Sequence, residues 1–541
     1  MAEDRIGRAS LFLASGTIVS RVLGFLKTLL LAAVIGAAGA GTNAFAAANQ
    51  LPNTIYVVVA GGVLSAVLVP LIVRSAANPD GGVAYLNKIV TLGFVVLGGA
   101  AILATLLTPL LTMLVGSRMS PGVFALAVAF GYWCLPQIFF YGMYSLLGEV
   151  LNAKRVFGPF TWVPVLNNLV ALAGLGAFAL IFGTDPDGDR WAAGDWTGGM
   201  IALLAGSATL GVAAQALILF WFWKRAGLSY RPDFRWRGVG LRSTATMAGW
   251  TFGMLLLTTI AGFVETSIAG VSAENSTEAS IYALQTAWLI FMLPHSVITV
   301  SIATAYFTRM SEHAAIGELD RVRADFSSAV RGVSVIVILA AAGLIVCAYP
   351  FARVFTGVEP LVWATGDVII AYVAGLIGFS ILFIVQRTFY SLGDTRTPFF
   401  FTLAQSVIFI VLALACIALP SSLVAVGIAI ATTVAGTVQL IIAVVLLRRR
   451  LGGLDGRRIV ESIARSVVAL LMPVLAGVWL LIMLGGTDAD GFALSSRVGA
   501  LITMAVIAVV MTVLYFVILW VTRSPELRGF AEPILARLTR R

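Results

Sequence analysis

The chain has 541 residues, of which 60% are hydrophobic and only 11% charged, whereas roughly a quarter of the residues in a soluble domain are charged. This composition excludes a soluble globular protein and indicates an integral membrane protein. A net charge of +10 would point to nucleic acid in a soluble protein, but here the basic residues gather in the loops predicted on one side of the membrane. We therefore expect a multi-pass membrane protein with both termini in the cytoplasm, and few basic residues outside: Arg118, Arg190, Arg353 and Arg497.

About fourteen apolar stretches approach the ~20 residues that a spanning helix needs. Hydrocarbon leaves an open sheet edge without hydrogen-bond partners, so these spans predict an all-α polytopic fold. The loops between them are short and lack the common hydrolase and nucleotide-binding motifs. The spacing of Cys134, Cys347 and Cys416 is not typical of a metal site. We expect a transporter that is not an enzyme and has no cofactor.

The first span, residues 10–36, contains SRVLGFLK and places Arg21 and Lys27 where hydrocarbon would otherwise lie. At ~1.5 Å per residue Arg21 falls near the bilayer midplane, where exposure of a charge to lipid is costly. We expect Arg21 to face a wet cavity, the alternative being an ion pair with a buried acid. For Lys27 the alternative is snorkelling to the outer interface. Gly24 between them could bend the helix and serve as a hinge.

The second span contains NAFAAANQLPN, with Asn49 and Asn53 on either side of Pro52. Proline removes a backbone hydrogen bond, so we expect a broken helix there, a hinge whose free carbonyls and amides line a cavity. Asn49 and Asn53 are then candidate substrate-binding residues, although intramembrane amides more often hold helices together. Asn43, at the start of the span, is expected near the outer mouth.

Acidic residues are few in the spans. Glu149 near the inner end of the fourth span and Glu265 near the outer end of the seventh could bind a coupling ion, sodium or a proton, although an acid near an interface is usually just hydrated. The loop TDPDGDRWAAGDW has the opening spacing of a calcium loop, but Arg190 and Trp196 replace the Gly and Glu that the motif requires. We expect an ordinary acidic loop at this place.

Prolines indicate an internal repeat of about 240 residues, because Pro52 recurs as Pro294 and Pro159 as Pro398. Such a repeat holds six helices, an even number, which predicts two six-helix lobes in parallel orientation plus two extra C-terminal helices. The boundaries that follow are lobes at 1–223 and 243–447, a basic cytoplasmic linker at 224–242, extra helices at 448–522 and a basic cytoplasmic tail at 523–541. Residues 309–331 predict a short amphipathic helix at the inner surface.

The opening SRVLGFLKTLLLAAVIGA, followed by NAFAAANQLPN, resembles the MurJ/MviN family of lipid II flippases, in the multidrug/oligosaccharidyl-lipid/polysaccharide exporter superfamily, and is closest to its actinobacterial branch. FGPFTWVPVLNN, LPHSVITVSIATAYFTRMSEHAA and FYSLGDTRTPFF match as well, so that the resemblance covers the first twelve spans. It implies a V-shaped pair of lobes around a cationic cavity and a C-terminal groove for a polyprenyl tail. The basic positions that bind substrate in the family correspond to Arg21 and Lys27.

The resemblance also implies a cargo, undecaprenyl-diphosphate-linked disaccharide-pentapeptide, moved to the outer leaflet for peptidoglycan synthesis, with the cell-wall synthesis machinery as a partner. Many members have two arginines and then a glutamate after the second span's PN, where this chain has Tyr56, Val57 and Gly61. Span 8 has His295 as its basic candidate where an arginine is usual. The cavity is therefore expected to be less basic. The alternatives are a flippase for another polyprenyl-linked glycan and a drug or cation antiporter of the superfamily.

Overall fold

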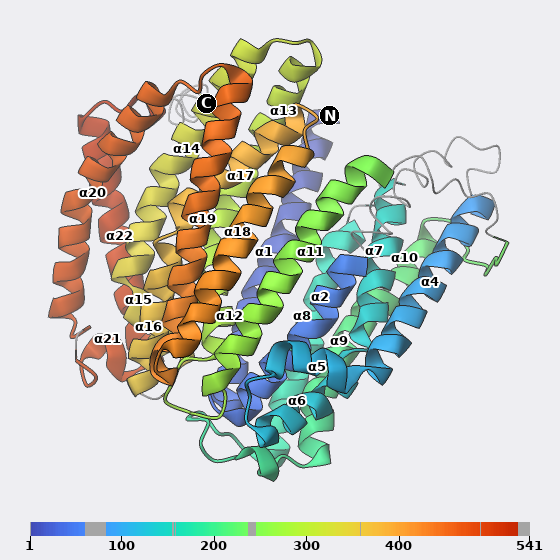
Figure 1. Cartoon of the computed structure of the whole chain (residues 1–541). Helices are drawn as coiled ribbons and strands as arrows, with labels where there is room; N and C mark the ends of the chain where they lie inside the picture. Colours follow the sequence, from blue (N-terminus) through green and yellow to red (C-terminus); the bar gives the residue numbers. More distant parts are fainter. Residues whose placement is uncertain are drawn as a thin grey trace. The chain divides into compact units, whose positions relative to one another are not determined.

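A computed structural model describes residues 2–59, 83–153, 156, 158–235, 245–357, 359–486 and 488–527 (Figure 1). The described residues form helices joined by short turns, and no strand occurs among them. Thirteen of the described helical segments are long and apolar enough to cross a membrane. The expected span around residue 60 runs into residues 60–82, which lie outside the described part. The prediction of an all-α polytopic membrane protein is confirmed.

Clustering of the packed helices divides the chain into two compact units, Met1–Ser276 with Ser280–Tyr282, and Thr277–Ala279 with Ala283–Arg541. The helices of the first unit are α1 (Ala2–Ile35), α2 (Ala40–Val59), α4 (Val83–Leu106), α5 (Thr108–Gly116), α6 (Pro121–Cys134), α7 (Gln137–Ala153), α8 (Gly158–Phe182), α9 (Gly198–Leu217), α10 (Leu219–Arg225) and α11 (Ala245–Ala269). Helix α11 packs on α2 and α5, so it lies in the first unit, although the repeat predicts a second lobe from residue 243. The repeat itself stays a prediction.

The second unit is built around α14. Its helices are α12 (Ile281–Pro294, most of which belongs here), α13 (Val300–Ala315), α14 (Leu319–Val346), α15 (Ala348–Phe355), α16 (Glu359–Val373), α17 (Leu376–Ser391), α18 (Arg396–Ala415), α19 (Ser421–Leu451), α20 (Gly456–Met483), α21 (Phe492–Ser495) and α22 (Arg497–Val521). Helix α14 packs against α13, α17 and α20, and α20 packs against α22. Many α14 side chains are therefore buried, whereas α20 exposes much of its apolar surface.

Close helix packing in the first unit depends on small residues. A Cβ atom on Gly174 of α8 would lie 2.2 Å from the side chain of Ser207 of α9, and one on Gly211 would lie 2.5 Å from Asn167 Oδ1. Because lipid provides no hydrophobic force between helices, such close backbone approach is a main source of helix association in membranes. Helices α8 and α9 therefore form a tight pair, against which α1 packs through α8.

The described part of the basic linker docks on α4 and is not a free connector. The buried side chain of Leu228 joins the apolar core of α4, α7 and α10. The Tyr230 hydroxyl lies 3.0 Å from Thr91 Oγ1, and the same oxygen accepts the backbone N–H of Asp233 at 3.0 Å. Hydrogen bonds and the charge of Arg235 hold the pKa of Asp233 at about 2. The later linker residues 236–242 lie outside the described part.

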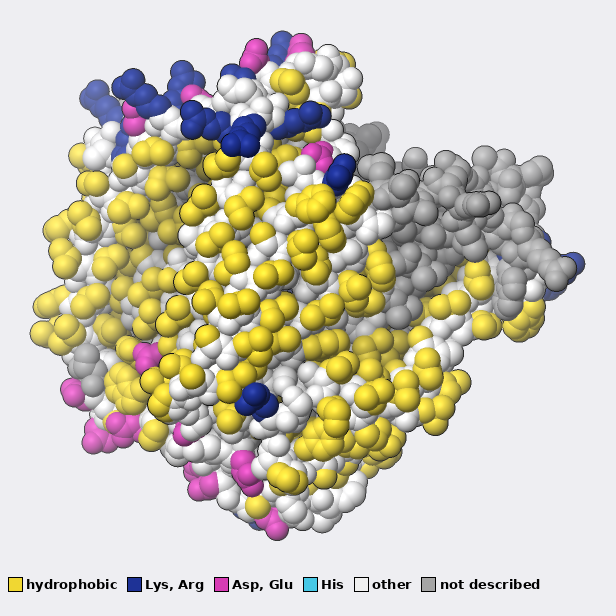
Figure 2. All heavy atoms as spheres, in the orientation of Figure 1, with side chains coloured by type: hydrophobic (Ala, Val, Ile, Leu, Met, Phe, Trp, Pro, Cys, Tyr) yellow, Lys and Arg dark blue, Asp and Glu magenta, His cyan; other side chains and the backbone are white. Residues whose placement is uncertain are grey.

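Charged side chains gather at the two ends of the second unit. Figure 2 shows most of the visible Lys and Arg at one end, together with a few Asp and Glu, and further Asp and Glu at the other end, with a mainly apolar surface between them. At the basic end, α19 finishes with Arg448, Arg449 and Arg450, and α20 starts with Arg457 and Arg458. Water can solvate charges only outside the hydrocarbon, so this pattern is typical of a membrane-embedded helix bundle.

The amphipathic helix predicted at 309–331 does not form as a separate element. Helix α13 continues to Ala315, the chain turns at Gly317 with φ of 78°, and α14 starts at Leu319. The buried Asp325 carboxylate pairs with Arg309 at 2.9 Å and with His313 at 2.8 Å across this corner. The apolar residues that suggested a surface helix instead pack in the helical hairpin, with Val322 and Phe326 buried.

Candidate functional site

Arg21 and Lys27 lie on one uninterrupted helix, α1, which shows no break at Gly24. Gly24 faces α8, since a Cβ atom there would lie 4.0 Å from the amide of Asn168. At ~100° per residue, Arg21 and Lys27 project about 60° to either side of this α8-facing line. The Arg21 side chain is exposed and Lys27 is half-buried. The bend expected at Gly24 is therefore not needed to turn both cations toward one half of the helix.

A tight turn joins α1 to α2, while α1 itself packs mainly against α8. Gly36 and Gly39 adopt positive φ angles of 83° and 93°, and Thr42 Oγ1 donates to the carbonyl of Ile35 at 2.8 Å. Counting ~1.5 Å per residue from this turn, Lys27 and Asn49 both lie about 13 Å away along their helices, and Arg21 and Asn53 both about 20 Å. Along the two helices, each cation therefore lies about as far from the turn as one predicted amide ligand.

The two amides of α2 have different surroundings. Asn49 is half-buried, and its Oδ1 accepts a hydrogen bond from Gln137 Nε2 of α7 at 3.2 Å. Gln137 also donates to Thr209 Oγ1 at 2.9 Å, so this side of Asn49 belongs to a network between helices. Its Nδ2 group is directed away from Gln137 as a hydrogen-bond donor. Asn53 is exposed.

The break predicted at Pro52 is wrong. Helix α2 runs without interruption from Ala40 to Val59, and Pro52 is buried within it. A proline inside a helix leaves one carbonyl of the preceding turn without its usual donor, which need not interrupt the remaining ladder. A hinge role for Pro52 and Gly24 stays a prediction.

Asn43 lies fully buried, which corrects the expectation of an accessible position at the outer mouth. Its Nδ2 donates to the carbonyls of Gly39 at 3.1 Å and Ala273 at 3.0 Å. Its Oδ1 accepts the backbone N–H of Tyr282 at 3.1 Å. The side chain thus joins the start of α2 to the turn after α11 and to the first turn of α12. Its role in this structure is to hold these segments together.

The two predicted ion-coupling acids lie on different helices. Glu149 is half-buried near the end of α7, close enough to Tyr56 of α2 to interact with it electrostatically. Tyr56 also hydrogen-bonds to Ser145 and lies against Tyr141, with ring centroids 5.8 Å apart. Glu265 is half-buried near the end of α11, beside Thr266, which donates to Gln50 Oε1 at 3.3 Å. Glu149 therefore lies near a polar group of α2, and the residue after Glu265 contacts another.

The acidic loop after α8 is organised by one carboxylate. Asp185 accepts the backbone N–H groups of Gly188 at 3.0 Å, Arg190 at 3.1 Å and Trp191 at 3.4 Å. Its own N–H donates to the carbonyl of Val34 at 2.8 Å. The Asp185 oxygens thus accept hydrogen bonds from the backbone of the loop. Over the described residues, no group of three or more His, Cys, Asp or Glu is arranged to hold a metal ion.

His295 does not provide an exposed cation in span 8. It lies in a π-helical turn, His295–Thr299, and only 2% of its surface is exposed. Its Nδ1 lies 3.3 Å from Ser380 Oγ, and Phe379 and Phe383 pack against its ring. Burial among aromatic rings indicates a packing role for this side chain in the second unit.

Sequence reasoning missed Arg387, a half-buried residue inside the candidate span that ends with α17. Its guanidinium lies over the rings of Phe383 at 4.9 Å and Phe307 of α13 at 5.5 Å. Within the described residues, no acidic side chain forms an ion pair with it. The signal in the sequence is a lone arginine in the apolar run FIVQRTFY.

A family model described as lipid II flippase MurJ matches residues 31–495. The chain belongs to the MurJ family. Arg21 and Lys27 precede the matched residues, so their roles depend on the geometry above. The MurJ family is one of flippases, so the chain is a multi-pass membrane transporter and not an enzyme.

Curated relatives agree with this assignment to the MurJ family. A probable lipid II flippase MurJ of Haemophilus influenzae is 28% identical over 424 residues, 71% of this chain and 75% of the relative. One of Rhizobium tropici is 25% identical over 84% of this chain and 83% of the relative.

Solved structures share the fold. A lipid II flippase MurJ in an inward closed conformation is 18% identical, with a TM-score of 0.71, and covers 97% of this chain and 100% of that chain. An inward-facing multidrug resistance transporter of the MATE family is 16% identical, with a TM-score of 0.64, over 81% of this chain and 96% of that chain.

The environment of Asn43 generates a stability prediction. We expect Asn43→Ala to lower the free energy of unfolding by about 2 kcal/mol or more, since a buried carbonyl and a buried N–H lose their partner. Asn53→Ala, an exposed residue on the same helix, should change it by less than about 0.5 kcal/mol. Thermal unfolding in detergent measures both, and equal melting temperatures for the two variants would contradict the role given to Asn43.

Proposed function

We propose that this chain moves lipid II from the inner to the outer leaflet of a bacterial plasma membrane by alternating access, with both termini in the cytoplasm. Beside the family membership, the proposal is supported by the two helices that the tight turn joins. Arg21 of α1 and Asn53 of α2 lie about equally far from this turn, as do Lys27 and Asn49. Two cations and two amide donors within membrane-spanning helices suit a lipid whose headgroup begins with a diphosphate.

The chemistry of these groups assigns their roles. The Arg21 guanidinium is planar, always charged and able to bind two phosphate oxygens at once, whereas the Lys27 ammonium acts as a point charge. The Nδ2 group of Asn49 and the exposed amide of Asn53 donate hydrogen bonds to phosphate or sugar oxygens.

The alternatives within the superfamily differ in the charge of the cargo. A drug or cation antiporter would need an acidic cavity, and the similarity to a MATE transporter concerns the fold alone. Arg21 and Lys27 favour an anionic cargo. A flippase for another polyprenyl-linked glycan would also carry an anionic cargo. Tyr56 stands where many family members have an arginine, and this difference supports that alternative. Cell-wall synthesis enzymes would be the partners in either case.

Energy for the cycle can come from the membrane potential. Outward movement of an anionic headgroup across an inside-negative membrane is favourable by ~2.3 kcal/mol per net charge per 100 mV. We therefore propose that the potential biases the cycle. Glu149 and Glu265 are the candidates for an additional proton or sodium ion.

Depletion of the protein in its native host tests the proposed function. Lipid II should accumulate in the inner leaflet while the enzymes that synthesise it stay active, because the next step requires the headgroup outside. Lipid II accessibility in intact spheroplasts and total lipid II by mass spectrometry measure the two quantities. Accumulation of a different polyprenyl-linked glycan would instead support the alternative flippase.

Arg21 should be required for transport but not for folding. Arg21→Ala is expected to abolish growth complementation at a normal membrane level of protein, and Arg21→Lys to restore it only in part, because an ammonium lacks the bidentate geometry. Arg235→Ala, which removes an exposed arginine of the linker, is the matched control and should complement fully. A well-expressed Arg21→Ala strain that grows normally would show that this cation does not bind cargo.

Alternating access predicts conditional labelling at Asn53. In a variant without Cys134, Cys347 and Cys416, a cysteine at position 53 should react with a membrane-impermeant thiol reagent from outside in only part of the population. A cargo analogue or loss of the potential should change that fraction. A cysteine at the buried position 43 should not react. Full reactivity at position 53 from both sides at once would indicate a pore, and no reactivity under any condition would contradict a central cavity.

A further inference from the structure

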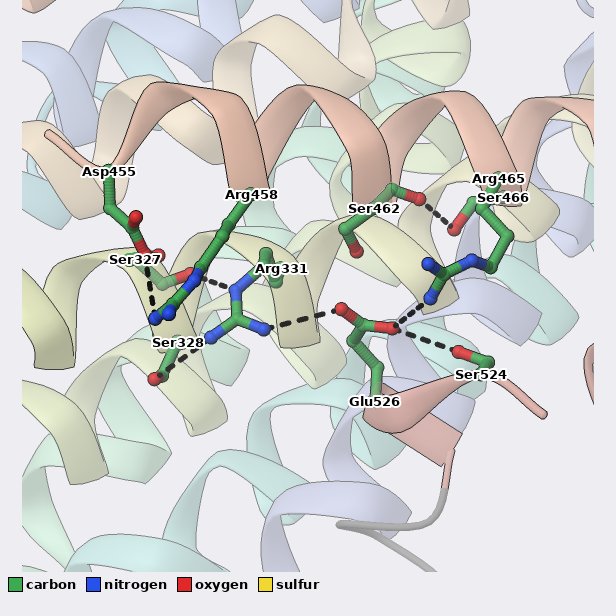
Figure 3. Close-up of polar contacts among 10 residues, drawn as sticks. All are labelled: Ser327, Ser328, Arg331, Asp455, Arg458, Ser462, Arg465, Ser466, Ser524 and Glu526. Atoms are coloured by element: carbon green, nitrogen blue, oxygen red, sulfur yellow. Dashed lines mark hydrogen bonds and ion pairs between the residues drawn. The ribbon is translucent and has the colours of Figure 1, made fainter.

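Glu526 joins three elements of the second unit at their basic end (Figure 3). Its Oε1 lies 3.3 Å from Arg331 Nη1 of α14, and its Oε2 lies 3.5 Å from Arg465 Nη1 of α20. Ser524 Oγ donates to Oε2 at 2.9 Å. Only 7% of the Glu526 side chain is exposed, against 22% for Arg331 and 37% for Arg465. One carboxylate therefore pairs with two guanidinium groups from two different helices.

The chain folds back after α22 to bring Glu526 to this position. Arg523 adopts a positive φ of 54°, a conformation uncommon for a residue other than glycine. The N–H of the buried Ser524 then donates to the carbonyl of Leu519 at 2.9 Å. Burial raises the pKa of Glu526, but hydrogen bonds and the charge of Arg331 outweigh this effect and lower it overall. The carboxylate is thus charged at neutral pH.

Further contacts hold the α20–α22 pair to its neighbours at both ends. At the basic end, Ser327 Oγ of α14 donates to Asp455 Oδ2, just before α20, at 2.9 Å. At the opposite end, the Arg353 guanidinium of α15 donates to the carbonyls of Leu494 and Ser495, which lie between α20 and α22. Between the ends, the Tyr515 hydroxyl of α22 donates to the carbonyl of Val335 of α14 at 2.9 Å.

These polar contacts matter because lipid provides no hydrophobic driving force that would hold α20 against α14. The buried face of α20 consists mainly of small residues: Ser462, Ser466, Ala469, Pro473 and Gly477. Its other face exposes large apolar side chains, among them Leu471, Leu475 and Trp479, which lipid solvates as well as another helix would. Helix association in such a setting depends on close packing and on polar links. Among the links described above, that of Glu526 has two charged partners.

We propose that Glu526 is a positioning residue for transport, which fixes α20 and α22 on α14 so that the three helices move as one body throughout the cycle. This inference rests on the proposed transport function. It differs from an ordinary stabilising contact because a covalent link between α14 and α20 should replace the carboxylate.

The test uses the full-length protein without native cysteines, reconstituted in proteoliposomes with a fluorescent lipid II analogue. Ser327→Cys and Asp455→Cys are introduced together and joined by a short bis-methanethiosulfonate. Glu526→Gln should reduce transport of the analogue about tenfold or more at an unchanged amount of folded protein, and Glu526→Asp should restore part of it. Glu461→Gln is the matched control, an exposed acid of α20 paired with Arg457 at 2.7 Å, and should transport normally.

The cross-link decides between positioning and other roles. In the Glu526→Gln protein it should return transport to within about twofold of the cross-linked protein that retains Glu526. Normal transport by Glu526→Gln without a cross-link would overturn the proposal. Loss of transport on cross-linking the protein that retains Glu526 would also overturn it, because α14 and α20 would then have to separate during the cycle.

The cross-linking yield gives a reading that does not depend on the cargo. It should be complete and equal with and without the lipid II analogue, and in the Arg21→Ala protein as well. An incomplete yield, or one that changes with cargo, would show that the helices move apart and would overturn the inference. If none of the proteins transports the analogue while the yield stays complete, the proposed function fails and the rigid α14–α20–α22 body stands.

Discussion

Polar groups inside a bilayer cannot bond to water, and this constraint determines the role of nearly every polar residue in the described part of the chain. A buried amide or hydroxyl needs a partner within the protein, or it must face a wet cavity. Asn43 and Gln137 meet the first condition through several bonds each, and both are almost completely buried. Arg21 and Asn53 are exposed, which within spanning helices is costly unless water reaches them. Exposure, more than residue type, therefore separates candidate ligands from structural groups.

The same constraint explains how helices are held together. Backbone groups are satisfied within each helix, and lipid solvates apolar faces, so contacts between helices depend on small residues and a few directed polar bonds. The α8–α9 pair uses Gly174 and Gly211 for close approach. The α20–α22 pair uses a buried stripe of small residues together with ion pairs and carbonyl contacts at its ends. Function in such a bundle depends on which of these contacts persist and which change.

Basic residues of this chain serve two purposes that composition alone does not separate. Most mark the solvated end of a helix, as Arg448, Arg449 and Arg450 do at the end of α19. A few lie within spans, where a charge is energetically costly and usually has a function. Arg387 belongs to the second class although it is less than two turns from the end of α17, and its guanidinium stacks on Phe383 and Phe307.

Much of this protein could be predicted from the sequence. Hydropathy determines the spans and the all-α class, because a segment of suitable length and polarity has no other stable form in lipid. Motif resemblance identified the family, and the charges in SRVLGFLK marked α1 as unusual. The helical period also predicted that Arg21 and Lys27 lie about 120° apart, a relation that needs only the geometry of one helix.

Tertiary structure decided whatever depends on the neighbours of a residue. Asn43 and Asn53 belong to one polar motif, but only Asn43 is buried. It contacts Ala273 and Tyr282, more than two hundred positions away, whereas Asn53 is exposed. Pro52 does not break α2, because the rest of its hydrogen-bond ladder persists. Residues 309–331 form a corner of two long helices that pack against each other. Glu526 meets Arg331 and Arg465 only after the chain has folded back on α14 and α20. Local pattern reports what a segment can become, whereas the partners that satisfy its polar groups exist only in the folded protein.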